Sequence, residues 1–474
     1  MTGRLIVISN RVNPPNDEGA GTTGGLAMAL ASALREYQGV WFGSSGETTD
    51  KFTGHLSMQR VGGVTIALVD LEPQDRDEYY NGYANRTLWP LFHHRVDLTA
   101  YERTYDEGYV RVNRRFAETA RPLVEPDDFV WVHDYHLSPL ARELRQMGVQ
   151  NRIGFFLHIP WPARRLFVTL PRHRQLAEAL FAYDLIGFQT QDSLDAFRDY
   201  VCDEAGGKAF DDGRLEAFGR TTRAGAFPIG IDPAEFARSS QSPQASESFA
   251  RMKESQAGRK MILGVDRLDY SKGLEERFLA YDQFLHDNAD QREKVFLLQI
   301  APPSRDEVDA YQEIRAKLDA ISGRINGNYA TIDWVPVRYV NTSFRRDELA
   351  GIYRAAHIGL VTPLRDGMNL VAKEYVAAQD PGDPGVLILS RFAGAAAQMK
   401  DALIINPYSR EDLSDAIKRG LTMGREERIR RWEALMHGVQ TDDVASWRDN
   451  FVRALRAAAI NAPPSTAATA TRRN

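Results

Sequence analysis

Residues 363–374, Pro-Leu-Arg-Asp-Gly-Met-Asn-Leu-Val-Ala-Lys-Glu, are the stretch from which we infer the fold of this chain. They follow the apolar run 358–361, which is typical of a buried parallel strand, and they lead into a helix-forming run. The free N–H groups at the start of a helix, together with the helix dipole, favour phosphate binding. Gly367 lets a ligand approach the backbone, Asp366 places a carboxylate at the lip, and Glu374 lies one turn into the helix, suited to ribose hydroxyls. The turn therefore fits a sugar carried by a nucleoside diphosphate; the alternative is a surface loop that Asp366 caps.

The composition is that of a globular protein, with 474 residues, 43% of them hydrophobic and 26% charged. A chain of this length exceeds one ordinary core, so we expect two or three domains. The net charge of -5, without long charged runs, argues against nucleic acid as the main partner. Cys202 is the single cysteine, which excludes an internal disulfide, and we expect it to be a small core residue. The start of the chain lacks a leader pattern and no run is long enough to span a bilayer, which predicts a cytoplasmic protein.

The first half of the chain alternates apolar runs with helix-like stretches, the pattern of a mostly parallel, doubly wound α/β sheet. The apolar runs are 4–9, 40–43, 64–69, 129–133, 153–158 and 185–188. Ligands bind beyond the carboxyl ends of such strands, where Asp134 and His158 stand. Gly24 and Gly25 precede the expected helix 26–36 and would expose N–H groups to an anion, with a flexible turn as the alternative.

The second half repeats this alternation after residues 239–259, whose Ser, Gln, Lys and Glu content predicts a linker or an exposed helix. Strands are expected at 261–265, 295–300, 358–361, 386–389 and 403–405, and helices at 370–378 and 432–455. Arg267 and Lys272 follow the first of these strands, where two cations would neutralise a diphosphate leaving group; the alternative is two solvated basic residues. The Ala, Pro, Thr and Ser content beyond residue 457 predicts a disordered tail.

Two patterns are similar to metal sites, and we interpret neither as one. His133 and His136 have a spacing found in zinc sites, but no cysteine pair or further histidine cluster completes a ligand set. Asp75 and Asp77 form an Asp-x-Asp pattern that holds a divalent ion in some enzymes, but the polar stretch around them favours a surface helix. The sequence therefore predicts no metal and no cofactor.

Several longer strings resemble one known family. They are ISNR (8–11), DEYYN (77–81), LWP (88–90), WVHDYH (131–136), GFFLHIP (154–160), RLDYSKG (267–273) and TPLRDGMNLVAKEYVAAQD (362–380). Through them, residues 4–455 resemble the trehalose-6-phosphate synthases, retaining glycosyltransferases with the GT-B architecture. The resemblance implies an α/β fold of two Rossmann-like, doubly wound domains that face a central cleft. It implies an acceptor domain at 1–238, on which a C-terminal helix at about 440–457 packs back, a nucleotide-sugar domain at 239–439 and a disordered tail at 458–474.

The activity that the resemblance implies is glucosyl transfer from a nucleotide-diphosphate glucose, expected to be UDP-glucose, to glucose 6-phosphate. The products would be α,α-trehalose 6-phosphate and the nucleoside diphosphate, in trehalose biosynthesis and stress protection. Retention would follow a front-face route, in which the leaving phosphate oxygen takes the proton of the acceptor, without an enzyme nucleophile or a metal. Catalysis would then consist of positioning and of charge stabilisation on the diphosphate. The partners would be these small molecules, without nucleic acid or membrane, and a homo-oligomer stays open.

The resemblance also implies roles for residues at matching positions. The catalytic residues would be Asp366, His158, Arg267 and Lys272. The sugar-donor side would consist of Gly24, Gly25, Arg267, Lys272, Phe344, Asp366, Gly367, Met368, Asn369, Leu370, Val371, Ala372, Lys373 and Glu374, and the acceptor side of Arg11, Tyr80, Trp89, Asp134 and Arg305. Closure of the cleft would assemble both sides and exclude water.

One departure from the family pattern and three other functions stay open at this point. Arg164 and Arg165 stand where many relatives carry a small residue or proline and then an acid, and we interpret them as partners of surface acids, with tighter acceptor-phosphate binding as the alternative. The other functions are a sister transferase with glycerol 3-phosphate or an aminocyclitol phosphate as acceptor, a non-catalytic sensor of sugar phosphates, and a nicotinamide dehydrogenase. The sensor would be expected to have lost the donor residues, which are present, and the dehydrogenase lacks its Gly-x-Gly-x-x-Gly motif.

Overall fold

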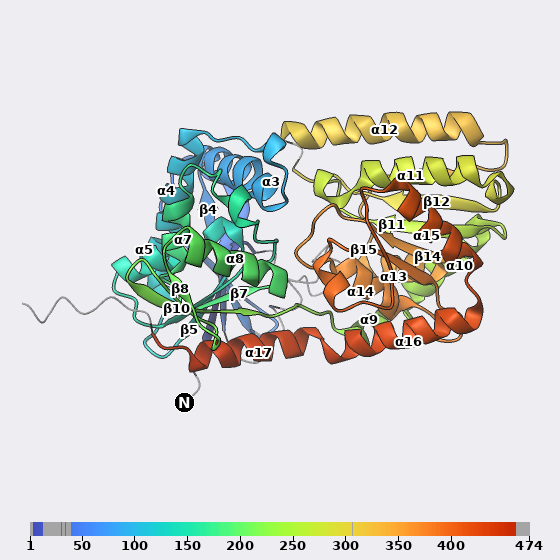
Figure 1. Ribbon diagram of the computed structural model, residues 1–474. Helices are drawn as coiled ribbons and strands as arrows, with labels where there is room; N and C mark the ends of the chain where they lie inside the picture. Colours follow the sequence, from blue (N-terminus) through green and yellow to red (C-terminus); the bar gives the residue numbers. More distant parts are fainter. Residues whose placement is uncertain (1–2, 13–29, 31–33, 35–38, 306, 461–474) are drawn as a thin grey trace, which may run out of the picture.

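The structure, a computed structural model, describes residues 3–12, 30, 34, 39–305 and 307–460. Gly24 and Gly25, the expected helix 26–36 apart from two residues, and the tail from residue 461 lie outside the described residues. Within the described part, two α/β domains lie side by side, and two long C-terminal helices run along one side of both (Figure 1). None of the helices described is both long and apolar enough to cross a membrane.

The first domain contains a ten-stranded sheet in the order β3-β4-β2-β1-β5-β6-β7-β10-β9-β8. Its strands are β1 (Leu5–Arg11), β2 (Val40–Thr48), β3 (Ser57–Val61), β4 (Val64–Leu71), β5 (Phe129–His133), β6 (Arg152–Phe156), β7 (Leu185–Phe188), β8 (Lys208–Ala209), β9 (Arg214–Ala217) and β10 (Arg220–Ala226). The central strands from β4 to β10 are parallel, and β3, β9 and β8 add antiparallel edges. The mostly parallel sheet expected for this half of the chain is confirmed.

The second domain contains a six-stranded sheet, all parallel, in the order β13-β12-β11-β14-β15-β16. Its strands are β11 (Lys260–Val265), β12 (Val295–Ile300), β13 (Val337–Val340), β14 (Ile358–Val361), β15 (Val386–Ser390) and β16 (Leu403–Ile405). The order reverses between β11 and β14, which is the topological switch point of a doubly wound sheet and the expected place for a ligand.

Helices cover both sheets. In and after the first domain they are α2 (Pro73–Asp75), the π-helix η1 (Arg76–Leu88), α3 (Trp89–Phe92), α4 (Arg103–Ala120), α5 (Leu140–Gln146), α6 (Arg164–Phe167), α7 (His173–Leu180), α8 (Gln191–Asp203), α9 (Pro233–Ser239) and α10 (Pro243–Gln256). The remaining ones are α11 (Leu274–Asp287), α12 (Asp309–Tyr329), α13 (Arg346–Ala355), α14 (Leu370–Ala378), α15 (Arg410–Thr422), α16 (Arg425–Thr441) and α17 (Val444–Ala457). Short 3-10 turns, 96–98, 121–123, 135–137, 270–272, 289–291 and 394–397, complete the connections.

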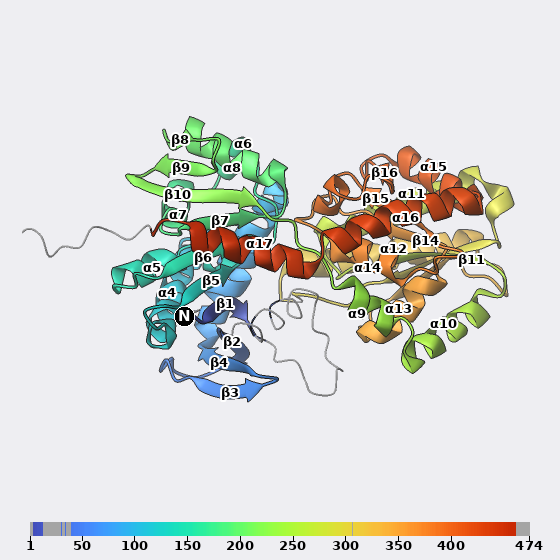
Figure 2. The same cartoon turned by 90° about the horizontal axis from the view of Figure 1, so that it is seen from below.

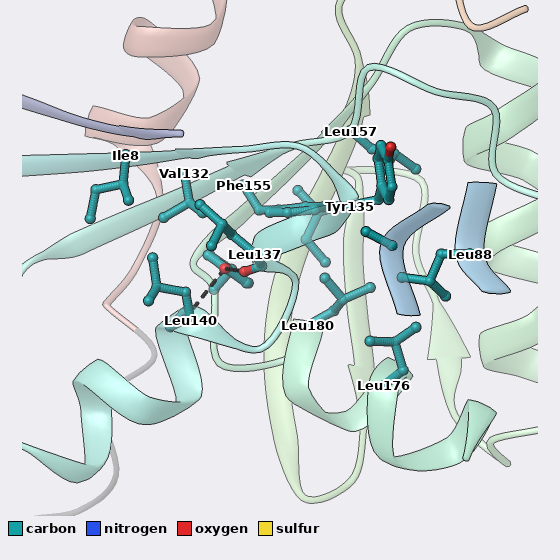
Figure 3. Close-up of a cluster of buried hydrophobic side chains, with 14 of the residues drawn as sticks. Ile8, Leu88, Val132, Tyr135, Leu137, Leu140, Phe155, Leu157, Leu176 and Leu180 are labelled. Carbon is teal, nitrogen blue, oxygen red and sulfur yellow. Dashed lines mark hydrogen bonds between the residues drawn. The ribbon is translucent and has the colours of Figure 1, made fainter. Parts of the chain in front are cut away.

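The core of the first domain lies directly beneath the region where the expected site residues stand. Figure 3 shows Val132 and Phe155 of the sheet facing Leu140, Leu176 and Leu180 of the covering helices, and all of them are buried. Full burial of one such side chain stabilises a fold by about 1.5–3 kcal/mol. The carboxyl ends of β5 and β6 therefore stand on a well-packed base that holds the loops after them in place.

The C-terminal end consists of two helices, α16 and α17, and the single helix expected over 432–455 is wrong. The carboxylate of Asp443 accepts the Ser446 N–H at 2.7 Å and caps α17, which starts a new helix. A Cβ on Gly230 would lie 2.1 Å from the carbonyl oxygen of Asp442, so the linker backbone passes directly under the break. The break lets α17 cross onto the first sheet (Figure 2). There Phe451 stacks on Trp131 with ring centroids 4.5 Å apart.

Two further comparisons with the sequence concern single positions. Cys202 is exposed at the end of α8, so its expected place in the core is wrong. The division at residue 238 falls inside α9, between the last strand of the first sheet and the first strand of the second, and the domain bounds stay a prediction.

Candidate active site

The candidate site lies where the carboxyl edges of the two sheets meet. Asp134 and His158 follow β5 and β6 of the first sheet, while Lys272, Arg305 and Asp366 follow β11, β12 and β14 of the second. Contacts between these two sets, given below, bring the two edges face to face. This is the place at which open α/β sheets bind their ligands.

The strand, turn and helix predicted around residues 363–374 are confirmed, because β14 ends at Val361 and α14 begins at Leu370. The ammonium of Lys272 lies 2.5 Å from Oδ2 of Asp366, and Nδ2 of Asn369 donates to the same oxygen at 3.2 Å. Oδ1 of Asn369 accepts the Ala372 N–H at 3.2 Å and caps α14. The turn is therefore tied together by one carboxylate and one amide.

The ion pair between Lys272 and Asp366 is almost fully buried. Burial alone would raise the pKa of the Asp366 carboxyl, but the charge and hydrogen bond of Lys272 hold that pKa below its ordinary value. The Asp366 carboxyl therefore stays ionised at neutral pH beside the Lys272 ammonium. They place a cation and an anion side by side at the switch point of the second sheet.

Gly367 and Met368 complete the turn by packing. A Cβ on Gly367 would lie 1.9 Å from the carbonyl oxygen of His158, so only glycine fits where the turn meets the first domain. Met368 is buried, and its carbonyl accepts the Ala395 N–H at 2.8 Å. The turn that carries Asp366 therefore rests directly against the loop that carries His158.

Glu374, in the second turn of α14, is partly buried. Burial raises the pKa of its carboxyl to about 7; Arg346 opposes this rise and Glu235 adds to it. The neighbouring ammonium of Lys373 donates to the carbonyl of Ile229 and to Oε1 of Gln398, both at 2.8 Å. Lys373 thus ties α14 to the linker between the domains, a structural role in addition to the expected backbone contact.

The remaining expected donor residues have less specific surroundings. Leu370, Val371 and Phe344 are partly buried and pack on the same hydrophobic cluster, with Phe344 in the loop between β13 and α13. Arg267 is exposed, and its guanidinium lies 5.7 Å from the ring centroid of Trp89. The structure therefore brings Arg267 to the candidate site, while a base contact for Phe344 stays a prediction.

His158 is a partly buried, neutral histidine. Its Nε2 lies 3.0 Å from Nδ1 of His133 and its Nδ1 lies 3.2 Å from Nε2 of Gln189. Burial lowers the pKa of His158 to about 3, so the ring forms hydrogen bonds without carrying charge. His133 is thus engaged with His158 through one ring nitrogen, and the absence of a zinc site at His133 and His136 stays a prediction.

Asp134 is held in an unusual backbone conformation, with φ 74° and ψ 165°. Its Oδ1 accepts the His158 N–H at 3.1 Å. Burial raises the pKa of its carboxyl to about 6, although the hydrogen bond from His158 and the charges of Arg305 and Arg267 act in the opposite direction. A strained aspartate at a strand end is a common feature of functional sites.

Arg305 links the two domains. Its backbone is left-handed at φ 54°, and its guanidinium donates to Oδ2 of Asp269 at 3.2 Å in its own domain. In the first domain it donates to the Tyr135 hydroxyl at 3.3 Å and lies 3.8 Å from the ring centroid of Trp89. Trp89 therefore lies near the expected acceptor cation, Arg305, and the expected donor cation, Arg267.

Tyr80 and Arg11 complete the expected acceptor side. The Tyr80 ring stacks on His136 with centroids 5.8 Å apart and an angle of 11° between the planes. Arg11 is exposed at the end of β1, and its guanidinium lies against Gly46. We call Tyr80, Trp89, Asp134 and Arg305 the acceptor group. A shared contact of Arg11 and Arg305 with one phosphate stays a prediction.

The Asp-x-Asp pattern and Arg164, the first of the two arginines, have clear structural roles. Asp75 is helical as expected, but the expected surface position is wrong, because Asp75 is fully buried. Its carboxylate lies 2.9 Å from the Arg111 guanidinium and pairs with Arg115. These two cations use the carboxylate that a metal would need. Arg164 lies 3.6 Å and 3.7 Å from carboxylates of Asp203 and Glu204, which confirms its expected pairing with surface acids.

Sequence reasoning missed residues that support the expected ones. Asp269 and Tyr135 hold Arg305. Each lies inside a motif string, close in sequence to an expected site residue, and this closeness is the signal that could have identified it. Gln189 holds His158 and also accepts the Ile229 N–H at 3.0 Å. Glu307 joins the two domains and had no sequence signal at all.

The fold and the site together define a class of enzyme. Two doubly wound domains meet at their strand ends, with cations and a helix N-terminus from one domain and aromatic and acidic residues from the other. Close structural relatives have this architecture, and the expected GT-B glycosyltransferase fold is confirmed.

Comparison with known proteins gives the family. The model of glycosyltransferase family 20 matches residues 6–457, and the chain belongs to this family. Trehalose-6-phosphate synthase of Sinorhizobium fredii is 48% identical over 456 residues, covering 96% of this chain and 98% of that protein. The resemblance to trehalose-6-phosphate synthases inferred from the motif strings is therefore confirmed, as is the enzyme class.

Two solved structures are similar over almost the whole chain. An α,α-trehalose-phosphate synthase (UDP-forming) from Burkholderia xenovorans, in complex with glucose-6-phosphate, is 50% identical with a TM-score of 0.92, covering 96% of this chain and 100% of that one. The Escherichia coli enzyme bound with UDP-2-fluoro glucose is 46% identical with a TM-score of 0.92, covering 96% of this chain and 99% of that one.

Proposed function

We propose that this protein transfers glucose, with retention, from UDP-glucose to glucose 6-phosphate and forms α,α-trehalose 6-phosphate and UDP. The observation that carries the proposal is the meeting of two charged sets at the facing sheet edges, Lys272 with Asp366 and Arg305 with Trp89. The complexes of the Burkholderia xenovorans and Escherichia coli relatives with glucose-6-phosphate and with a UDP-sugar analogue support the two substrates.

On the donor side, Arg267 and Lys272 would neutralise the diphosphate while N–H groups at the start of α14 bind its oxygens. Gly24 and Gly25 would contribute N–H groups from the first domain. Glu374 would hold the ribose hydroxyls, and Phe344 would lie near the base. The short distance of Lys272 to Asp366 supports this arrangement, because Asp366 would hold the glucose and Lys272 the diphosphate bonded to it.

On the acceptor side, Arg11, Tyr80 and Arg305 would bind the phosphate, and Trp89 and Asp134 would position the ring. Arg305 is suited to this role because its planar guanidinium presents paired N–H groups to phosphate oxygens. Asp134 would accept a hydrogen bond from a sugar hydroxyl, which its carboxylate form does best, above its pKa of about 6.

We further propose a front-face mechanism without an enzyme nucleophile. The bond between the anomeric carbon and the diphosphate breaks, the acceptor oxygen bonds to the same face, and its proton passes to the leaving phosphate oxygen. A retaining hydrolase would use a free carboxylate as nucleophile. Here the Asp366 carboxylate is engaged by Lys272 and Asn369, so we assign it, with His158, to the glucose hydroxyls. Positive side chains would supply the charge stabilisation, so the proposed route uses no metal.

Three broader features of the protein are also proposals. We propose the two-domain division at residue 238 with α17 returning to the first domain, a cytoplasmic location, and small molecules as the partners. A homo-oligomer stays open. The contacts of α17 with Trp131 support the first of these.

Product analysis with a panel of substrates tests the proposed function. The protein is incubated with UDP-, GDP- or ADP-glucose and with glucose 6-phosphate, glycerol 3-phosphate or an aminocyclitol phosphate. We expect a disaccharide phosphate from UDP-glucose and glucose 6-phosphate, with the α,α-linkage visible by NMR. A product from another acceptor alone would make the protein a sister transferase, and the absence of any product would contradict the proposal.

A further inference from the structure

Glu307 connects the two domains next to the expected acceptor site. It follows Arg305 by two residues and precedes α12, which starts beside the first domain (Figure 1). Its carboxylate accepts hydrogen bonds from the Arg76 guanidinium at 2.9 Å and from Nδ2 of Asn81 at 2.6 Å. Its carbonyl accepts a further bond from the Arg86 guanidinium at 2.8 Å. All three hydrogen-bond donors belong to the first domain.

The three donors come from one π-helix, η1, and lie five residues apart. In a π-helix the hydrogen bonds run between residues five apart, so such residues are neighbours on successive turns, as residues four apart are in an α-helix. In an α-helix they would be separated by about 140° around the axis, since each residue turns about 100°. The π form therefore gathers Arg76, Asn81 and Arg86 on the side that faces Glu307.

The same π-helix leads into the acceptor group. It carries Tyr80, and Trp89 follows its last residue. Arg305 and Glu307 thus contact two adjoining elements of the first domain from a single loop. Arg305 contacts Trp89 at the start of α3, and Glu307 bonds to η1. Val308, the next residue, is buried in the hydrophobic cluster of the first domain.

The burial of the partners indicates which contact matters most. The side chains of Arg76 and Glu307 are 49% and 56% exposed, so their ion pair contributes little in water. Asn81 is only 7% exposed, so without the Glu307 carboxylate its amide would lose a hydrogen-bond partner that water does not easily replace. The bond from Asn81 to Glu307 is therefore the stronger connection.

We propose that Glu307 is a positioning residue for the acceptor. It fixes the loop that carries Arg305 on the π-helix, so that the guanidinium stands above Trp89 where the acceptor phosphate binds. The proposal rests on the proposed function, in which Arg305 binds that phosphate. Glu307 touches neither substrate; it acts through Arg305 and makes acceptor binding depend on contact between the domains.

Steady-state kinetics of matched variants test the proposal. Glu307→Ala should raise KM for glucose 6-phosphate about five- to tenfold, with kcat and KM for UDP-glucose within about twofold. Glu307→Gln keeps an acceptor oxygen for Asn81, so it should stay within about twofold of the natural protein. Glu107→Ala removes an exposed pair with Arg103 inside α4 and serves as the control, with no change expected.

A double-mutant cycle identifies the partner. Asn81→Ala should match Glu307→Ala, and the double variant should be no worse than either, because both remove the bond between Asn81 and Glu307 and the exposed pair with Arg76 contributes little. Additive effects, or a parallel loss of kcat and both affinities, would show a general structural role and overturn the proposal. An unchanged KM for glucose 6-phosphate in Glu307→Ala would overturn it as well.

Amide hydrogen exchange separates this proposal from the proposed function. Without any substrate, Glu307→Ala should exchange faster than the natural protein over residues 76–88, whereas Glu107→Ala should not. If the natural protein fails to use glucose 6-phosphate, the proposed function fails and the exchange result still decides whether Glu307 holds the π-helix. Equal exchange in both proteins would contradict that contact.

Discussion

The turn that carries Asp366 and Asn369, together with Lys272 (here called the donor turn), differs from the acceptor group in where its residues come from. Lys272, Asp366 and Asn369 all belong to the second domain and are already bonded to one another. The acceptor group instead joins Arg305 of the second domain to Trp89 of the first. The donor turn is thus complete within one domain, whereas the acceptor group exists only while the domains touch. Changes to the donor turn should therefore act mainly on turnover, and changes to the acceptor group mainly on acceptor affinity.

Removal of the buried cation has the largest expected effect. In Lys272→Ala, negative charge that develops on the diphosphate loses its nearest stabilising group, and turnover should fall about 10²–10³-fold. Initial rates at saturating substrates measure this loss, and calorimetry should show far less change in glucose 6-phosphate binding. Lys317→Ala, at a 60% exposed side chain on α12, is the control. A Lys272→Ala protein with near-normal turnover would refute the assignment.

Arg305 tests the other half of the comparison. Arg305→Ala should raise KM for glucose 6-phosphate about 10- to 100-fold, the range expected for loss of charged hydrogen bonds, and leave KM for UDP-glucose nearly unchanged. Arg305→Lys should be intermediate because lysine keeps the charge but lacks the planar fork. Equal effects on both substrates in a steady-state assay would place Arg305 outside the acceptor site.

Glu374 gives a smaller, pH-dependent effect that belongs to the donor side alone. With a pKa of about 7, its carboxylate is mostly protonated at about pH 6 and mostly ionised at about pH 8, and only the ionised form accepts from both ribose hydroxyls. KM for UDP-glucose, whose pyrophosphate does not titrate in this range, should therefore fall up to about tenfold between these values. Glu374→Gln should remove that slope, and an identical slope in the variant would exclude Glu374 as its source.

The same carboxyl predicts a change in stability with pH. The folded protein holds the Glu374 proton more tightly than the unfolded chain, whose pKa is near 4.5. Its contribution to the free energy of unfolding is fully present below about pH 4.5 and is lost as the pH rises through about 7. Urea unfolding measures the free energy of unfolding of the natural protein and of Glu374→Gln across this range. The difference between the two free energies should shrink at low pH, and the free energy of the natural protein should fall more steeply as the pH rises.

Much of the fold could be predicted because fully buried parallel strands appear as continuous apolar runs. Strands β5, β7, β12 and β14 match the expected runs residue for residue. Strand β10 was missed because polar and apolar residues mix in Arg220–Ala226, although the strand pairs with β7 and β9 inside the sheet. The break between α16 and α17 was missed because the helical pattern continues on both sides, and the capping role of Asp443 depends on the linker that passes beneath it.

The candidate site was predictable where its residues lie close in the sequence or inside the motif strings. Asp366 and Asn369 belong to one turn, and Lys272, which is 94 residues away from Asp366, was predicted as one of two cations that follow a strand. Glu307 lies 226 residues from Asn81, and although Asn81 ends the DEYYN string, Glu307 lies outside all of the motif strings. The π form of residues 76–88 has no signal in composition or spacing, because it arises from contacts with the rest of the fold.

The return of α17 to the first sheet has a mechanical consequence. The chain passes between the domains twice, once before α9 and again between α16 and α17, so the two domains are held by two covalent tethers that lie close together at Gly230 and Asp442. Two adjacent tethers act as a pivot: they permit the domains to swing about a common axis, but prevent them from sliding past each other. A fragment cut at residue 238 would lack Phe451 and expose the face of Trp131, so the N-terminal half should aggregate when produced alone.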